Sequence, residues 1–188
     1  MGRRLSSNQI KRLTGEAIEQ MPMSADVRLA MKTNVAIVAA LTTQIELLES
    51  RLQEMVRPRR EYALLTSVPG IGQILATTIL LEIGTIERFA GAGQFASYAR
   101  CVDSAHMSNG KKKGEGNTKN GNKYLAWAFV EAANFARRYL PEAKQFFERK
   151  KAKTNNVVAT KALAHKIARA CYHMLREGKP FDVGRCFA

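Results

Sequence analysis

The sequence is poor in several features that assign a chain to a common class. It has three scattered cysteines, Cys101, Cys171 and Cys186, and no CxxC pair, which excludes a disulfide framework and a zinc ribbon and is typical of a reducing cytosol. No apolar run reaches eighteen residues, so no membrane span is predicted. The basic start MGRRLSSNQIKRL lacks the apolar core of a signal peptide. Strand patterns are weak throughout, which leaves a chain dominated by helical periodicity.

The patterns of familiar catalytic centres are missing as well. The three histidines have no metal-ligand spacing with one another or with the cysteines. There is no P-loop or dinucleotide fingerprint, and the acids of the second half show no pattern that would hold two magnesium ions. We therefore predict no metal site and no complete metal-dependent nuclease in this chain.

Positive charge is abundant and unevenly distributed. The chain carries 30 Lys and Arg against 16 Asp and Glu, a net charge of +14. Residues 1–99 contribute 11 bases and 9 acids, whereas residues 100–188 contribute 19 bases and 7 acids, so the second half holds +12. A domain this basic usually meets a polyanion. Charge alone does not distinguish DNA, RNA and an anionic surface.

The predicted fold class is all-α, in two parts. Residues 1–58 form an N-terminal segment and a long helix, in which apolar residues recur on a heptad rhythm between Val27 and Met55 for about 45 Å. Ser24 with Asp26 is the expected N-terminal cap, and Pro58 ends the segment. The pattern favours a coiled coil that joins subunits, although a helix docked on its own domain has the same signature.

Residues 59–188 are predicted to form a helical domain that begins with two apolar helices around the turn Pro69-Gly70-Ile71-Gly72. This pattern resembles a helix-hairpin-helix, whose turn amides at Gly70 and Gly72 bind a phosphate without reading sequence. An ordinary corner between two helices is the alternative. Further helices are expected at 124–139, from Pro141, and at 156–177. The basic run Arg149, Lys150 and Lys151 is either a nucleic-acid backbone contact or a solvated face.

The stretch from Ser108 to Lys123 contains sixteen residues and no apolar side chain, and we expect it to form a polar Gly/Lys/Asn loop. Lysines and backbone amides stabilise the charge of a phosphate under attack. A serine hydroxyl is a nucleophile only when a base or a metal activates it, and a serine before Asn-Gly more often caps a turn. The candidate phosphate contacts in the loop are Lys111, Lys112, Lys113, Lys119 and Lys123.

The segments VPGIGQILATTILLEIG and FASYARCVDSAHMSNGKKKGEGNTKNGNKYLAWAFVEAANFARR together resemble the C-terminal transposase domain of the bridge-RNA-guided insertion-sequence transposases. Members of that family pair a RuvC-like DEDD domain with a serine-bearing domain. The resemblance runs from about Leu64 to the end of the chain, and the heptad region suits the family's coiled-coil linker. The ordered combination of PGIG, S-x-G-K and K-x-G-N-x-Y-L carries it.

The resemblance implies a site and partners. It implies that Ser108 is the nucleophile that forms a covalent link to a DNA strand end, with Asn109 departing from the Ser-Gly-Gly of many relatives and Ser104 as the rival. It implies DNA and a guide RNA as partners, a homodimer or tetramer through the coiled coil, and a cytoplasmic, nucleoid-associated location in a bacterium. The family's DEDD carboxylates bind Mg²⁺, and we expect them on a domain outside this chain, which holds no cofactor itself.

The predicted function is therefore the C-terminal part of a DNA transposase, inactive in strand exchange when alone. A non-catalytic module that binds DNA or guide RNA is the alternative, and it differs from the first only at Ser108. A structural RNA-binding protein of ribosomal type explains the charge but neither the heptad region nor the position of the serine.

Overall fold

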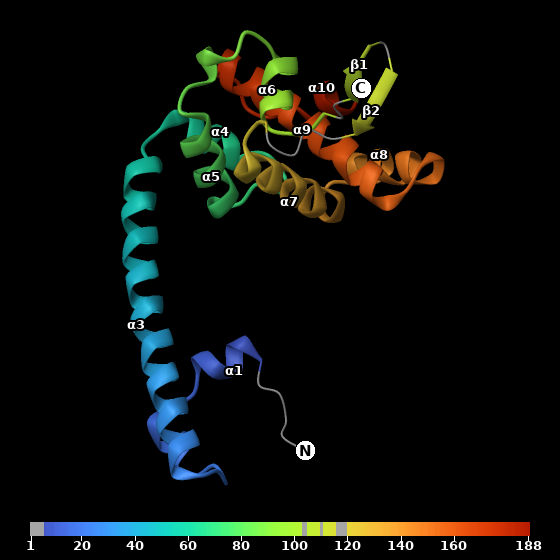
Figure 1. Ribbon diagram of the computed structural model, residues 1–188. Helices are drawn as coiled ribbons and strands as arrows, with labels where there is room; N and C mark the ends of the chain where they lie inside the picture. The colour runs from blue at the N-terminus through green and yellow to red at the C-terminus, as the bar shows by residue number, and fades with distance from the viewer. Residues whose placement is uncertain (1–5, 103–104, 110, 116–119) are drawn as a thin grey trace. The chain divides into compact units, whose positions relative to one another are not determined.

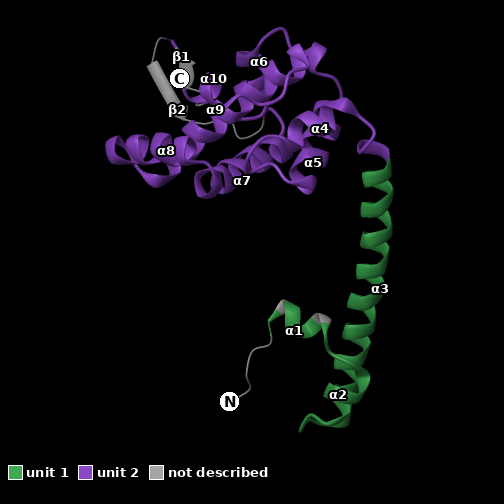
Figure 2. Cartoon of the chain, turned by 180° about the vertical axis from the view of Figure 1, so that it is seen from behind, with its two compact units in different colours: residues 1–54 green, residues 55–188 purple. Residues whose placement is uncertain are grey.

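The computed structural model describes residues 6–102, 105–109, 111–115 and 120–188, giving the backbone alone for two short strands. The predicted all-helical class is confirmed, including the long helix (Figure 1). The chain divides into two compact units, Met1–Glu54 and Met55–Ala188 (Figure 2).

The first unit contains helices α1 (Ser7–Lys11), α2 (Gly15–Glu19) and most of α3 (Ala25–Val56). Side-chain caps define the starts of the short helices. Ser6 and Gln9 form a capping box on α1, and the Thr14 hydroxyl accepts a hydrogen bond from the Ala17 amide at 3.2 Å on α2. Ile18 of α2 is fully buried.

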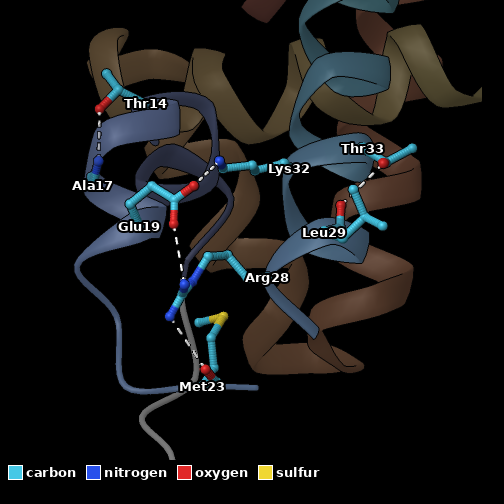
Figure 3. A network of polar contacts seen from close by, with 8 residues as sticks. All are labelled: Thr14, Ala17, Glu19, Met23, Arg28, Leu29, Lys32 and Thr33. Carbon is cyan, nitrogen blue, oxygen red and sulfur yellow. Dashed lines mark hydrogen bonds and ion pairs between the residues drawn. The ribbon is translucent and has the colours of Figure 1, made fainter. Parts of the chain in front are cut away.

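A polar network links α2 to the first turns of α3 (Figure 3). The carboxylate of Glu19 forms an ion pair with Arg28 at 3.2 Å and another with Lys32. The Arg28 guanidinium also donates to the carbonyl of Met23 at 3.3 Å. The hydrogen bond from Lys32 is the main reason why the pKa of Glu19 lies below its usual value.

Helix α3 matches the predicted heptad helix, and the Ser24 hydroxyl accepts from the Val27 amide at its start, as the sequence indicated. Its heptad residues include Leu41 and Leu48, which are 58% and 65% exposed. Such exposure is unusual for a row of large apolar side chains at heptad spacing. Met31 and Val38, which belong to the same row, are half-buried. From Leu41 onward, the large apolar residues of the row stay exposed within the described part of this chain.

The second unit contains the other elements, whose bounds are α4 (Arg60–Thr66), α5 (Gln73–Ile83), the 3₁₀ helix η1 (Ile86–Arg88), α6 (Ala92–Tyr98), β1 (Ala105–Ser108), β2 (Lys111–Glu115), α7 (Lys123–Tyr139), α8 (Pro141–Lys153), α9 (Asn156–Glu177) and α10 (Val183–Phe187). Helices α7, α8 and α9 pack against one another, and α5 and α6 pack on α7 and α9 respectively. Asn155 caps the start of α9 and Gly178, with φ of 63°, ends it as predicted.

Aromatic rings from three helices, together with Phe89 after η1, form the centre of this unit. Phe95 of α6 is fully buried, and its ring centroid lies 5.1 Å from that of Phe89, 5.8 Å from Phe129 of α7 and 6.1 Å from Tyr172 of α9. The pairs of Phe95 with Phe89 and with Phe129 are edge-to-face, an arrangement that favours one packing of the helices over others. The ring contact between Phe95 and Phe129 thus joins α6 to α7 in the core. The polar stretch connects these two helices in the sequence.

The polar stretch contains secondary structure that the sequence analysis did not predict. Strands β1 and β2 pair antiparallel with Ser108 opposite Lys111, and the register shifts between His106 and Met107. Asn109 follows β1 with φ of 51°. Two residues of sequence Asn-Gly between strands are typical of a tight hairpin, since Asn and Gly tolerate positive φ. The expected loop is therefore in part a β-hairpin.

Candidate nucleic-acid interface

The two ends of the polar stretch are held together at the surface of the core. On the incoming side, the Cys101 amide donates to the Ala96 carbonyl at 2.9 Å. On the outgoing side, the Asn122 amide donates to the Tyr98 carbonyl at 2.7 Å. The guanidinium of Arg100 then donates to the carbonyl of Gly121 at 2.9 Å, directly across the gap. The chain therefore leaves the core and returns to it at one place.

Asn122 connects this base to the helix that follows. Its side-chain oxygen accepts hydrogen bonds from the amides of Tyr124 at 2.8 Å and Leu125 at 3.0 Å, which caps α7. Its amide nitrogen donates to the carboxylate of Glu82 on α5 at 2.5 Å. Asn122 also hydrogen-bonds Tyr98 and, with Arg88, holds the pKa of that phenol below its usual value. The sequence analysis missed this residue, although an Asn before an apolar helix is a recognisable cap signal.

The predicted catalytic residue lies at the end of the hairpin's first strand. Ser108 is the last residue of β1, and Lys111, Lys112 and Lys113 open β2, so the backbone brings the serine and the lysines to one end of the hairpin. Ser104 and Lys119 lie outside the described residues. The exposed Lys123 begins α7, where its ammonium lies 4.9 Å from the ring centroid of Tyr124. The role of Ser108 stays a prediction.

Gly70 of the predicted phosphate-binding turn packs against α7. It has φ of 97°, and a β-carbon there would lie 2.5 Å from the carbonyl oxygen of Ala132 and 2.6 Å from the amide nitrogen of Ala136. The small side chains of α7 permit this close approach of two backbones. The amide of the next residue, Ile71, donates to the Val68 carbonyl at 2.9 Å. Gly70 thus has a packing role that the sequence analysis did not foresee.

Gly72 stands in a different environment. A β-carbon at this position would meet nothing within 4 Å, and no side chain caps the first amides of α5, which begins at the next residue. The groove beside the turn has a volume of about 640 Å³ and is lined mainly by apolar groups, among them the exposed Ile74 and Tyr139. No charged residue lines it among the described side chains. Phosphate binding by the amides at Gly72 stays a prediction, and the described lining of the groove contains no cation that would assist it.

Cations gather elsewhere, around a cavity of about 580 Å³ between α8, α9 and the C-terminal segment. We call this cavity the basic pocket. Its charged, histidine and aromatic lining comprises Phe146, Lys150, His165, Lys166, Arg169, His173, Lys179, Phe181, Asp182 and Arg185. Of these residues, the sequence analysis named only Lys150 as a candidate contact. The four-residue spacing of His165, Arg169 and His173 was the signal that places them on one side of α9.

The basic run on α8 does not form one contact surface. Lys150 lines the basic pocket, whereas Lys151 lines a second hollow with Arg137, Arg138 and other residues of α7 and α8. Successive side chains on a helix point about 100° apart, so neighbours in the sequence serve different faces. The predicted contact of this run with nucleic acid therefore divides into two candidate surfaces.

The three thiols of the chain are buried and free. Burial raises the pKa of Cys101 to about 12 and that of Cys186 to about 11, and it also raises the pKa of Cys171. The described residues contain no group of three His, Cys, Asp or Glu side chains placed to hold a metal ion. No helix in the described part of the chain is long and apolar enough to cross a membrane.

Taken together, the fold and the charges describe a basic helical protein with a lysine-rich hairpin and a cationic pocket, both suited to anionic partners. Part of the sequence is also similar to proteins that have been described before. Residues 62–148 match the family described as Transposase IS116/IS110/IS902 family. That segment begins in α4 and ends in α8, so it includes the PGIG turn and the hairpin, while most of the basic pocket lies beyond it.

A protein of similar sequence carries a description that agrees with this family match. The chain is 24% identical over 163 residues to a Streptomyces coelicolor protein described as "Insertion element IS110 uncharacterized 43.6 kDa protein". The aligned region covers 86% of this chain and 40% of that protein. The chain therefore spans less than half the length of the relative it matches.

Proposed function

We propose that this chain is the serine-bearing part of an insertion-sequence DNA transposase of the bridge-RNA-guided kind. The observation that carries the proposal is the match of residues 62–148 to the transposase family, because this segment includes Ser108 and the lysines of the hairpin. The proposed substrates are DNA strands, and a guide RNA is the proposed second partner. The proposed location is the bacterial cytoplasm, at the nucleoid.

In the proposed reaction, the hydroxyl oxygen of Ser108 attacks a phosphodiester. A bond forms between serine oxygen and phosphorus, the bond from phosphorus to one strand oxygen breaks, and that oxygen leaves as a hydroxyl end that takes up a proton. Lys111, Lys112 and Lys113 stabilise the negative charge on the phosphate while it is attacked. The clamped base of the hairpin, at Arg100 and Gly121, supports this arrangement because it limits where the strands can start.

The serine needs a group that removes its proton, and a serine hydroxyl is a weak nucleophile without one. The described residues offer no metal cluster for this purpose. We therefore propose that the activating carboxylates, with Mg²⁺, come from a RuvC-like domain on another polypeptide or another part of the protein. By this proposal the 188-residue chain binds nucleic acid but does not exchange strands by itself.

The test is a covalent protein–DNA adduct, detected on a denaturing gel after the chain is supplied with a RuvC-like domain. Ser108→Ala should abolish the adduct, while Ser97→Ala, on α6, should leave it intact as a matched control. An adduct that survives Ser108→Ala but is lost with Ser104→Ala would move the nucleophile by four residues along the sequence. Strand cleavage by the purified chain alone with Mg²⁺ would contradict the proposed division of labour.

A second candidate function is a non-catalytic module that occupies nucleic-acid sites made for the complete enzyme. It is favoured by the lack of a metal cluster among the described side chains together with the net charge of +14. Such a module would tolerate Ser108→Ala without loss of function. Its affinity would fall steeply with salt, roughly in proportion to the number of phosphates neutralised.

The proposal also includes pairing of two copies through α3. The exposed heptad row supports it, because leaving large apolar side chains in water costs free energy that a second helix would recover.

A further inference from the structure

The basic pocket carries positive charge that the described side chains do not fully neutralise. Lys150, Lys166 and Arg169 project into it from α8 and α9, and among the residues that the structure describes none of the three has a carboxylate in ion-pair range. The one acid in the lining, Asp182, accepts the Arg185 amide at 3.0 Å as the cap of α10. A cluster of unpaired cations repels itself, and an anion removes that cost.

The guanidinium of Arg185, by contrast, already has its partner. Its two terminal nitrogens each lie 2.6 Å from an oxygen of Glu177, which is the bidentate geometry preferred between arginine and carboxylate. The charge of Lys179 acts on the same carboxylate, because it helps to lower the pKa of Glu177. Lys150, Lys166 and Arg169 are therefore the lining cations that remain for an anion. The effect of Arg169 extends to its neighbour His165, whose pKa is lowered first by burial and then by the Arg169 charge.

Aromatic rings hold one of these cations in place and offer flat surfaces beside it. The ammonium of Lys166 lies 5.3 Å from the ring centroid of Phe146 and 5.9 Å from that of Phe187. These two rings are themselves 6.2 Å apart in an edge-to-face pair. Phe181 lines the pocket as well and is half-buried. Rings next to cations are the combination that proteins use to bind single strands, since each base stacks on a ring and each phosphate meets a cation.

The size of the pocket limits what it accepts. A volume of about 580 Å³ lies within the range of small-ligand sites, about 300–1,000 Å³. A volume of about 580 Å³ corresponds to a cube of about 8 Å on a side, which cannot enclose a duplex whose two strands are separated by a major groove about 12 Å wide. One or two unpaired nucleotides are a better match in size.

We propose that the basic pocket between α8, α9 and α10 binds a nucleotide of single-stranded nucleic acid, with its phosphate at Lys150, Lys166 and Arg169 and its base against Phe146 or Phe181. This site rests on the proposed function as a nucleic-acid-binding transposase part. It is separate from Ser108 and from the PGIG turn, and it lies mostly outside the segment that matches the transposase family. The strand is either DNA freed during recombination or an unpaired part of a guide RNA.

The experiment measures fluorescence anisotropy of labelled oligothymidylate, oligouridylate and a hairpin DNA duplex with the full 188-residue chain over a series of salt concentrations. The variants are Arg169→Gln and Lys150→Gln, and their matched controls are Arg176→Gln and Lys153→Gln, which remove the same charge from exposed positions on the same helices outside the pocket. Circular dichroism verifies that all four variants fold.

We expect each pocket variant to weaken single-strand binding about fivefold to tenfold, and each control to change it less than about twofold. The salt slope for single strands should fall by about 0.7 with each phosphate contact removed. Binding of the duplex should stay within about twofold of wild type for all four variants. Arg169→Lys, which keeps the charge, should recover part of the loss. If the pocket variants lose more affinity for oligothymidylate, the strand is DNA. If they lose more affinity for oligouridylate, the strand is RNA.

Equal binding by pocket variants and controls would overturn the pocket while leaving the proposed function standing. A loss of duplex binding as large as the loss of single-strand binding would also overturn it, because the pocket is too small for a duplex. If the wild-type chain bound none of the three probes, the proposed function itself would fail.

Discussion

Arg100 and Gly121 are 21 residues apart, and a hydrogen bond of 2.9 Å from the Arg100 guanidinium to the Gly121 carbonyl joins them. Both adopt positive φ, 53° at Arg100 and 85° at Gly121. An arginine in this region of backbone space is uncommon and is kept there only when its surroundings compensate the strain. The pair closes the base of the hairpin, at the end opposite to Ser108, so the strained backbone lies where the polar stretch leaves and rejoins the core.

Gly121→Ala tests this base. A β-carbon at position 121 would lie 2.6 Å from the Tyr98 carbonyl oxygen in a backbone conformation unfavourable for alanine. We expect a loss of about 1–3 kcal/mol in the free energy of unfolding, measured with urea, and a lower yield of adduct. The control is Gly93→Ala in α6, where nothing lies within 4 Å and alanine is a better helix former. Equal free energies of unfolding for the two variants would mean that the backbone at the base of the hairpin rearranges to accept the methyl group without loss of stability.

Gly70→Ala and Gly72→Ala separate packing from phosphate binding at the PGIG turn. At Gly70 the new methyl group would overlap the backbone of α7, so we expect a loss of about 2 kcal/mol or more in the free energy of unfolding. At Gly72 there is room and φ is −84°, so stability should change by less than about 1 kcal/mol. Weaker duplex binding by the stable Gly72→Ala variant would support the predicted phosphate grip. Unchanged binding would assign the turn to packing alone.

Leu48→Lys tests the proposed pairing of α3. Leu48 is on the heptad row and 65% exposed, while its neighbour Leu47 is 63% exposed and off the row, so the two substitutions cost the single chain about the same. In a symmetric coiled coil Leu48 is buried and Leu47 is not, and burial of a Leu side chain contributes about 1.5–3 kcal/mol of free energy in each copy. We expect Leu48→Lys to weaken dimerisation by about a hundredfold or more and Leu47→Lys to leave it unchanged, by sedimentation equilibrium. Similar behaviour of the two variants would exclude the predicted seam.

The buried thiols predict a pH dependence. The folded pKa is about 12 for Cys101 and about 11 for Cys186, above the usual value of 9.0 in the unfolded chain. Raised folded pKa values mean that the thiols contribute stability below pH 9 and that this contribution is lost as the pH rises toward 11 and 12. At pH 8 we expect a disulfide reagent to react with the folded chain far more slowly than with the chain in urea. Fast reaction of the native protein would show that the thiols are accessible.

Helix positions were the most predictable part of this fold. The final helix was predicted at 156–177 and forms at Asn156–Glu177, because an Asn cap and a Gly stop mark its two ends locally. The burial of side chains on it was less predictable. The apolar Val158 is 41% exposed, since it lies in the first turn of α9, before the helix packs fully on its neighbours. The spacing of apolar residues shows which side of a helix faces the core. It does not show along how many turns that side is buried.

The candidate site was predicted only in part. Lys150 and Lys151 are neighbours in the sequence, yet they line different hollows because α8 turns their side chains apart. Lys150 and Arg169 are distant in the sequence, and the packing of α8 on α9 brings them to one pocket. The hairpin was missed because its strands are rich in lysine and glycine and lack the apolar alternation that identifies strands.

The amino-acid sequence alone was enough for the helical class, the heptad row of α3, the excess of positive charge in the second half and the resemblance that points to Ser108. Each of these is local, because caps, periodicity, composition and motif order can be read from neighbouring residues. Three relations became visible only in the folded chain: Gly70 packs on α7, Arg100 and Gly121 close the base of the hairpin, and cations and rings from three helices enclose one pocket. These relations depend on how helices far apart in the chain approach one another, which burial of the shared core sets and no single segment encodes.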